Sequence, residues 1–438
     1  MRRALPTLLC LLFLASFACN LPAQELSRPP GKNVILIGWD GAQRAHVREC
    51  MERGELPALK ALVEEGAFVD IDVITGATDT KAGWTQILTG YHPEVTGVYS
   101  NGRYRDVPAG LSIFERLKKQ FGPDFVCVAV IGKRGNVGEV LPPTKRELSE
   151  EEAALILKLQ QEARQREKAR KAAKAQAASS GVQEEQPAAQ IDRQARQQQR
   201  ALRRALQLPA DKAERETARR QAIRGQIVEE AGKKYLVFGG SPYYTMHKVC
   251  DVWEYGLVED AKVGSRTIEL LEKYKDRPFF FFVHFASVDA NGHRYGENSK
   301  EYNDALISND LWTGKIIAKL KELGLYDRTL IYVTADHGFN EGERGHSYAP
   351  FIFLATNDPA VKRAGMRQDI APTILDRMGV NLSKIEPPLD GEPLTKPATK
   401  PVLKAPEKPP APKAAFKAKA SPQKDPAPRK KRFAPAPA

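Results

Sequence analysis

Residues 33–41 read Asn-Val-Ile-Leu-Ile-Gly-Trp-Asp-Gly, a short apolar run that ends in glycine and is followed closely by an acidic side chain. Four further short apolar runs lie at 125–131, 278–285, 329–334 and 350–354. Continuous rather than alternating apolar runs are typical of parallel strands that are covered on both faces. Helical patterns lie between them, at 56–65, 263–275 and 301–323. This alternation predicts a three-layer α/β/α sandwich with a mostly parallel central sheet.

The positive charge of the chain is concentrated in two segments outside this pattern. The chain has 438 residues and a formal net charge of +13. Residues 145–224 hold 19 basic and 12 acidic residues, a net charge of +7. Residues 386–438 hold 12 basic and 5 acidic residues, which is +7 again. The rest of the chain is therefore nearly neutral, and its basic isoelectric point does not indicate nucleic acid as a specific partner.

The composition predicts how the chain is organised. The α/β domain is expected in two parts, residues 31–144 and 233–392. Residues 145–232 are rich in Ala, Gln, Glu, Lys and Arg, which predicts charged surface helices inserted into the domain. Residues 393–438 are rich in Pro, Ala and Lys, which predicts a disordered tail. The basic insertion and tail could bind an anionic polymer of the cell envelope, and a purely solubilising role is the alternative.

The N-terminal residues have the form of an export signal. Arg2 and Arg3 precede a short apolar stretch at residues 8–17, and Ala23 offers a small residue for cleavage. We therefore predict a signal peptide at residues 1–23 and a secreted or periplasmic protein. A lipid anchor on Cys19 is the less favoured alternative.

Acidic residues and histidines follow the predicted strands. Because the carboxyl ends of parallel strands meet at one edge of a sheet, we expect these side chains to lie together. Each of them alone fits a cap, a salt bridge or a surface position, but their joint occurrence at strand ends favours a metal site. Carboxylates and imidazoles without thiolate suit two divalent ions, best Zn²⁺, with Mn²⁺ or another ion as the alternative. The candidate ligands are Asp40, Thr80, Asp289, His293, Asp336, His337 and His346.

Several motifs resemble those of the alkaline phosphatase superfamily, and most closely those of its type I phosphodiesterase/nucleotide pyrophosphatase branch. The motifs are GWDG (38–41), LPAL (56–59), TDT (78–80), ILTGYHPE (87–94), GVYSN (97–101), DANGH (289–293) and TADHG (334–338). Together they span residues 33–380 apart from the insertion. The resemblance implies that one metal is bound by Asp40, Thr80, Asp336 and His337, and the other by Asp289, His293 and His346.

The resemblance also implies the roles of two further residues. Thr80 would be the covalent nucleophile of the reaction. Asn101 would steady a phosphoryl oxygen, although Ser100-Asn101-Gly102 also reads as a simple turn.

Sulfatases belong to the same superfamily and provide an alternative. They use a cysteine or serine that is converted to an aldehyde, in a motif with arginine at its fifth place. Thr80 cannot give that aldehyde, and Trp84 occupies the fifth place here. Residues 132–138 (GKRGNVG), however, are similar to a sulfatase segment, so Lys133 could bind an oxyanion unless it is merely solvated at the surface.

These observations predict a secreted two-metal hydrolase of phosphate esters that works through a phospho-threonine intermediate. Phosphodiesters are favoured over monoesters, and the substrate is a small molecule, a lipid or a nucleotide. Within the superfamily, sulfate-ester hydrolysis and transfer of a phospho-alcohol group are the alternatives. A non-catalytic envelope protein that binds through its basic tail is an alternative of another class, and the intact set of seven ligand positions counts against it.

Overall fold

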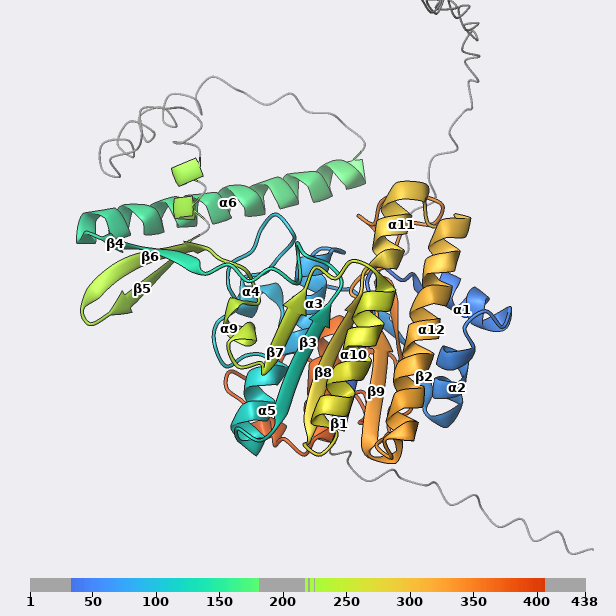
Figure 1. Cartoon of the computed structure of the whole chain (residues 1–438). Coiled ribbons are helices and arrows are strands. Elements are labelled where there is room, and N and C mark those ends of the chain that lie inside the picture. Colours follow the sequence, from blue (N-terminus) through green and yellow to red (C-terminus); the bar gives the residue numbers. More distant parts are fainter. Residues whose placement is uncertain (1–32, 181–216, 220, 224, 406–438) are drawn as a thin grey trace, which may run out of the picture. The chain divides into compact units, whose positions relative to one another are not determined.

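The protein has a central sheet of eight strands, and helices cover both of its faces. The computed structural model describes residues 33–180, 217–219, 221–223 and 225–405 (Figure 1). The strand order is β11-β2-β10-β9-β1-β8-β3-β7. The strands are β1 (Asn33–Trp39), β2 (Ala67–Asp72), β3 (Val126–Ile131), β7 (Val252–Tyr255), β8 (Phe279–Phe285), β9 (Thr329–Thr334), β10 (Phe351–Thr356) and β11 (Gly365–Met366).

Two groups of helices cover the two faces of the sheet. One group consists of α1 (Arg44–Glu52), α2 (Pro57–Glu65), α10 (Asp260–Tyr274), α11 (Ser287–Tyr295) and α12 (Lys300–Glu322). The other group consists of α3 (Thr80–Thr89), α5 (Ile113–Phe121) and α13 (Ile370–Arg377). Figure 1 shows α10 and α12 in front of the sheet. The shorter helices are α4 (Pro93–Thr96), α9 (Tyr244–His247) and the 3₁₀ turns Tyr326–Arg328, Arg367–Asp369 and Leu382–Lys384.

The predicted three-layer α/β fold is confirmed, and the reason lies in its central strands. Every residue of β1, β3, β8 and β9 is buried, as expected for strands covered on both faces. β1 is paired in parallel with β8 and β9, and β3 with β8 and β7. The predicted strand at 350–354 is the exception, because β10 runs antiparallel to β9 and β2. It follows β9 without the helical crossover that a parallel return requires.

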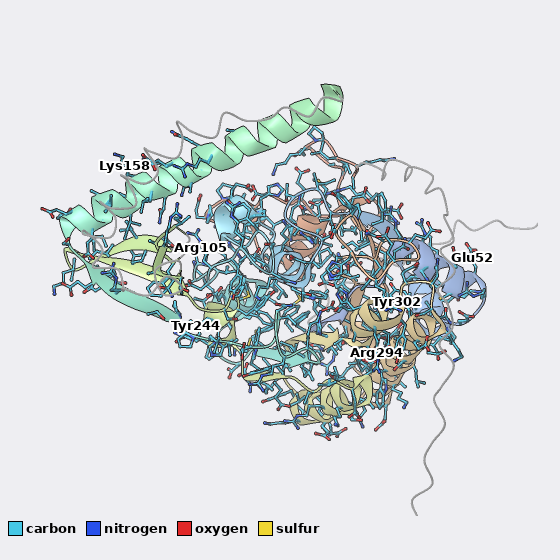
Figure 2. The ribbon with its side chains drawn as sticks, turned by 90° about the horizontal axis from the view of Figure 1, so that it is seen from above. Glu52, Arg105, Lys158, Tyr244, Arg294 and Tyr302 are labelled. Carbon is cyan, nitrogen blue, oxygen red and sulfur yellow. The ribbon has the colours of Figure 1, made fainter. Side chains whose placement is uncertain are left out.

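The inserted segment contains strands as well as a helix, so the prediction of helices alone was incomplete. Strands β4 (Pro143–Leu148), β5 (Gln226–Glu230) and β6 (Lys233–Gly239) form an antiparallel sheet in the order β4-β6-β5. Helix α6 (Glu150–Ser180) packs on it around a small core that contains Ile156 and Leu236. Arg105 joins the insertion to the main domain through a hydrogen bond of 3.1 Å from Nη1 to Gln226 Oε1 (Figure 2). β4 and β5 are mostly exposed and polar, so they lack the apolar runs by which the buried strands were predicted.

Residues 393–405, which the sequence placed in a disordered tail, make specific contacts with the domain. Leu394 is buried, and its backbone N–H donates to Thr373 Oγ1 at 2.8 Å. The backbone N–H of Ala405 donates to Asp72 Oδ2 at 3.0 Å. Residues 393–405 thus belong to the domain, because specific contacts offset the low hydrophobicity of the segment. The rest of the predicted tail and the predicted signal peptide lie outside the described residues. Among the residues that are described, no helix has both the length and the apolar character needed to cross a membrane.

Close packing of α3 on β1 depends on the absence of a side chain at Gly38. A β-carbon added there would lie 2.3 Å from Cη2 of Trp84, whose ring is fully buried. Gly83, on the same helix, faces Asp336, where an added β-carbon would lie 2.5 Å from Cβ. Both contacts bring the start of α3 against the carboxyl ends of β1 and β9.

Gly38→Ala should therefore destabilise the protein. Forcing a methyl group against the Trp84 ring is an overpacking change, which costs about 1–3 kcal/mol. Denaturant unfolding of the variant measures this cost. Gly102→Ala is the matched control, since a β-carbon there meets no atom within 4 Å. Equal stability of Gly38→Ala and the control would contradict the packing argument.

Candidate metal and catalytic site

The residues singled out from the sequence lie at one edge of the sheet. Asp40 follows β1, Lys133 follows β3 and Asp336 follows β9. Asp289 lies on α11, which begins just after β8. Thr80 is the first residue of α3. This edge is where parallel strands present their carboxyl ends, so the fold alone gathers the side chains.

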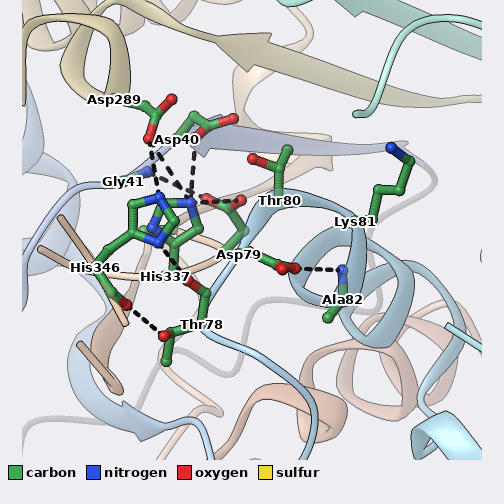
Figure 3. A network of polar contacts seen from close by, with 12 residues as sticks. Asp40, Gly41, Thr78, Asp79, Thr80, Lys81, Ala82, Asp289, His337 and His346 are labelled. Atoms are coloured by element: carbon green, nitrogen blue, oxygen red, sulfur yellow. Dashed lines mark hydrogen bonds and ion pairs between the residues drawn. The ribbon is translucent and has the colours of Figure 1, made fainter. Parts of the chain in front are cut away.

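Two overlapping groups of ligand atoms form at this edge. The first consists of Asp40, Asp336 and His337, and the second of Asp289, His337 and His346; within each group the ligand atoms lie within 4.8 Å of one another. His337 Nε2 lies 3.5 Å from Asp336 Oδ2 and 3.9 Å from Asp289 Oδ1 (Figure 3). The resemblance assigned His337 to the first metal only, whereas here it stands between both groups.

His293 lies next to the second group, and its side chain is more exposed than those of the group itself. Its Nε2 lies 3.4 Å from Asp289 Oδ1 and 3.1 Å from His346 Nε2. The contact with the Asp289 carboxylate raises the pKa of His293, and burial opposes this only in part. All seven residues predicted as ligands, Thr80 among them, thus lie at this one edge of the sheet. Their individual roles stay predictions.

The histidines of the cluster are oriented so that Nε2 faces the carboxylates. His293, His337 and His346 each place Nδ1 within 2.6–2.9 Å of a backbone carbonyl oxygen. A carbonyl only accepts, so each Nδ1 carries the proton and a neutral ring keeps its lone pair on Nε2. Burial lowers the pKa of His346 to about 4 and also lowers that of His337, which keeps both rings neutral at pH 7.

This arrangement fits cations. Asp289 Oδ1, Asp336 Oδ2 and His337 Nε2 are buried and make no hydrogen bond to any described residue. Nε2 of His293 and Nε2 of His346 lie 3.1 Å apart, so both rings offer a nitrogen to the same position. Buried acceptors without donors are costly, and a divalent ion that accepts all of their lone pairs removes the cost. Oxygen and imidazole donors together suit Zn²⁺ and similar ions.

Lys133 points into the cluster instead of toward solvent. Its Nζ lies 2.7 Å from Asp289 Oδ2, 3.0 Å from Asp40 Oδ2 and 3.0 Å from Thr80 Oγ1. Burial by itself lowers the pKa of Lys133, but the carboxylates around it outweigh burial and raise the pKa. The same ammonium overcomes the effect of burial on Asp40 and Asp289 and lowers the pKa of both. Burial and the charge of Asp40 raise the pKa of Asp336 instead.

The first turn of α3 is capped by side chains. The backbone N–H of Ala82 donates to Asp79 Oδ1 at 3.3 Å, and that of Lys81 donates to Asn101 Oδ1 at 2.9 Å. These N–H groups are therefore not available to a bound anion. The amide oxygen of Asn101 thus holds the backbone of the residue that follows Thr80.

Two supporting residues were missed by sequence reasoning. His284, within the Phe-rich strand β8, places Nε2 2.8 Å from Asp40 Oδ2. Arg367 is fully buried and donates to the carbonyl oxygens of Asp336 at 2.8 Å and of Thr75 at 3.1 Å. Burial lowers its pKa to about 10. A polar residue inside an apolar run was the only signal for His284, and no motif pointed to Arg367.

Comparison with known proteins places the chain among enzymes with such sites. The sequence model of the type I phosphodiesterase/nucleotide pyrophosphatase family matches residues 34–373. Steryl-sulfatase of Rattus norvegicus is 34% identical over 89 residues, which cover 19% of this chain and 15% of that protein. GPI ethanolamine phosphate transferase 1 of Mus musculus is 27% identical over 110 residues, 23% of this chain and 12% of that protein. The chain thus matches less than a fifth of the length of these curated relatives.

Solved structures with related folds show low sequence identity. The lipoteichoic acid synthase LtaP of Listeria monocytogenes has a TM-score of 0.45 and 13% identity, over 84% of this chain and 76% of that one. The alkaline phosphatase of the Antarctic bacterium TAB5 has a TM-score of 0.42 and 14% identity, over 80% of this chain and 99% of that one.

Asp289→Ala and His337→Ala should each lose bound metal. Each removes one of the converging ligand atoms and leaves the others without a shared cation. Metal content per chain after dialysis, measured by mass spectrometry, tests this, and circular dichroism checks the fold. Asp304→Ala, at an exposed aspartate on α12, is the control that should keep its metal. Full metal content in either ligand variant would refute the cluster as a metal site.

His284→Leu should weaken metal binding about 10–100-fold, the usual effect of losing a residue that orients a ligand. The reason is that Asp40 loses the partner that fixes its carboxylate. Competition with a chromogenic chelator measures the affinity. His284→Gln, which keeps an N–H donor, should recover part of it. If the leucine variant bound metal as tightly as the wild type, His284 would not orient Asp40.

Proposed function

We propose that this chain, which belongs to the type I phosphodiesterase/nucleotide pyrophosphatase family, is a hydrolase of phosphodiesters with Thr80 as its nucleophile. The family is part of the alkaline phosphatase superfamily, whose members hydrolyse or transfer phosphate and sulfate esters and depend on metal ions. The observation that carries the proposal is the position of Thr80 Oγ1, 3.0 Å from Lys133 Nζ at the rim of the ligand cluster.

The chain's own residues prepare Thr80 for attack. Thr80 is buried, and its position is set by the capped start of α3. Lys133 donates to its oxygen and, as a cation, favours the deprotonated form. The groups around Asp40 and Asp289 would hold two divalent ions, which would supply acidification of the attacking hydroxyl and neutralisation of charge on the leaving oxygen.

The reaction has two displacements at phosphorus. Thr80 Oγ1 forms a bond to phosphorus, the bond to one alcohol breaks, the hydroxyl proton is lost to solvent, and the departing alkoxide gains a proton. Asn101 donates from its amide nitrogen to a phosphoryl oxygen. Water then attacks phospho-Thr80, which releases a phosphate monoester and restores the hydroxyl.

The nucleophile separates this proposal from sulfatase chemistry. Sulfatase-type release requires an aldehyde hydrate, which a threonine cannot form. The identity shared with ethanolamine phosphate transferases supports transfer to an alcohol as the second candidate. Product analysis in the presence of added ethanolamine or glycerol distinguishes the two, because a transferase makes a new diester and a hydrolase makes a monoester.

The location and the polymer partner are also proposals, and they rest on sequence alone. Residues 1–23 support export to the periplasm or medium. The basic segments support weak binding to an anionic envelope polymer.

Thr80→Ala should lower turnover by several orders of magnitude, because the attacking oxygen is removed. Thr80→Ser should keep a substantial part of the activity. Metal content should persist in both variants, since the carboxylates and imidazoles remain. A slow substrate should label Thr80 covalently in the wild type, as read by mass spectrometry of peptides. A label on another residue would identify that residue as the nucleophile instead of Thr80.

Phosphodiesters should exceed sulfate esters by at least about 10²-fold in kcat/KM, a difference of about 2.7 kcal/mol in transition-state stabilisation. Both esters carry one negative charge, so charge alone does not separate them, and the chemistry of the nucleophile decides. Bis(p-nitrophenyl) phosphate and p-nitrophenyl sulfate, assayed on one zinc-loaded preparation, test this. Equal or reversed efficiencies would favour the sulfatase alternative.

A further inference from the structure

A second ammonium group lies beside the nucleophile and is not used in the reaction described above. Lys81 follows Thr80 at the start of α3, and Figure 3 shows the two side chains rising from the same part of the helix. Lys81 Nζ donates to Asn136 Oδ1 at 2.7 Å and weakly to Asn101 O at 3.4 Å. It also lies 4.2 Å from the centre of the Tyr104 ring.

The partners of Lys81 are neutral. In the described part of the chain, no carboxylate oxygen forms an ion pair with its ammonium, although the side chain is half-buried. Lys133, by contrast, contacts Asp40 and Asp289 directly. An ammonium group has three N–H donors, and the two hydrogen bonds of Lys81 use two of them, one weakly. Asp79 and Glu139 act on its charge from a greater distance, but no carboxylate contacts the ammonium directly.

One loop controls both lysines. Residues 132–138 supply Lys133 to the ligand cluster and Asn136 to Lys81. Asn136 has a φ of +69°, in the left-handed region that asparagine tolerates better than most residues. The backbone at this point therefore aims the amide oxygen at Lys81. A solvated surface lysine needs no such arrangement.

We propose that Lys81, held by Asn136, binds a second anionic group of the substrate, a carboxylate or phosphate on the alcohol arm of the phosphodiester. This inference rests on the proposed phosphodiesterase function. The scissile phosphate carries a single negative charge, which faces Lys133 and the metal ligands. The half-buried ammonium of Lys81, which has no carboxylate in direct contact, is further stabilised when the bound substrate brings another negative charge. Lys81 is thus a specificity-determining residue.

The test uses p-nitrophenyl phosphodiesters that share one leaving group and differ in the other arm. The arms are methyl, 2-carboxyethyl, 2-phosphoethyl and 2-trimethylammonioethyl. In the wild type, at least one anionic ester should exceed the methyl ester about tenfold or more in kcat/KM, mainly through KM, and the cationic ester should fall below it. Comparison of the carboxylate with the phosphate arm identifies the anion.

Variants of the subsite should change this preference. Lys81→Met keeps the length of the side chain and removes its charge, so the ratio of anionic to methyl ester should fall to about one. Lys81→Arg should restore part of the ratio. Asn136→Gly keeps the left-handed backbone and removes the amide, and it should lower the ratio without removing the lysine. Lys119→Met, at an exposed lysine on α5, should leave the ratio unchanged.

The outcomes separate this inference from the function on which it rests. A wild-type ratio near one, or a ratio that survives Lys81→Met, overturns the subsite while phosphodiester hydrolysis stands, and makes Lys81 a structural contact of Tyr104 and Asn136. If none of the four esters is hydrolysed, the proposed function fails and the subsite fails with it. Unfolding midpoints of the variants establish that each is folded.

Discussion

The structure depends on the electrostatics of three carboxylates, Asp40, Asp289 and Asp336, that are buried together at one edge of a sheet. Within the described residues, one ammonium contacts two of them, and oxygen and nitrogen acceptors beside them have no donor. Charges of one sign that are removed from water repel strongly, so such a cluster persists only with added cations. The orientation of the histidines agrees with this, because their Nδ1 protons are committed to backbone carbonyls and their Nε2 atoms face the carboxylates. Divalent ions bound here would therefore also stabilise this edge of the sheet.

Thr80, the proposed nucleophile, is placed by packing more than by polar contacts. Gly38 and Gly83 let α3 approach β1 and Asp336, and Trp84 fills the space between helix and sheet. The guanidinium group of Arg367 donates hydrogen bonds both to the carbonyl oxygen of Asp336 and to the segment that precedes α3. The ligand cluster and the reacting oxygen are thus parts of one rigid arrangement, in which a displacement of α3 would move Thr80 relative to every ligand. This is the kind of pre-organisation that a displacement at phosphorus requires.

The loop at residues 132–138 places two positively charged side chains at the site. In its first part Lys133 enters the cluster, and three residues later Asn136 orients Lys81. One ammonium is paired with carboxylates, whereas the groups in direct contact with the other are neutral. The first therefore acts on the reacting centre, and the second is suited to a charge that the substrate brings. The chemistry and the choice of substrate would then depend on the same short segment.

The sequence by itself determined the fold class, because continuous apolar runs between helical patterns leave few alternatives to a covered parallel sheet. It also determined which side chains gather at the site, since residues at strand ends meet wherever parallel strands do. It did not determine the direction of β10, the strands β4 and β5, or the packing of residues 393–405, which depend on pairing between distant segments. Only the tertiary structure decided that Lys133 is buried among carboxylates, that His337 stands between both ligand groups, and that His284 and Arg367 support them. Those facts depend on distances across the fold, and a linear sequence carries no record of which neutral or charged group a side chain will meet.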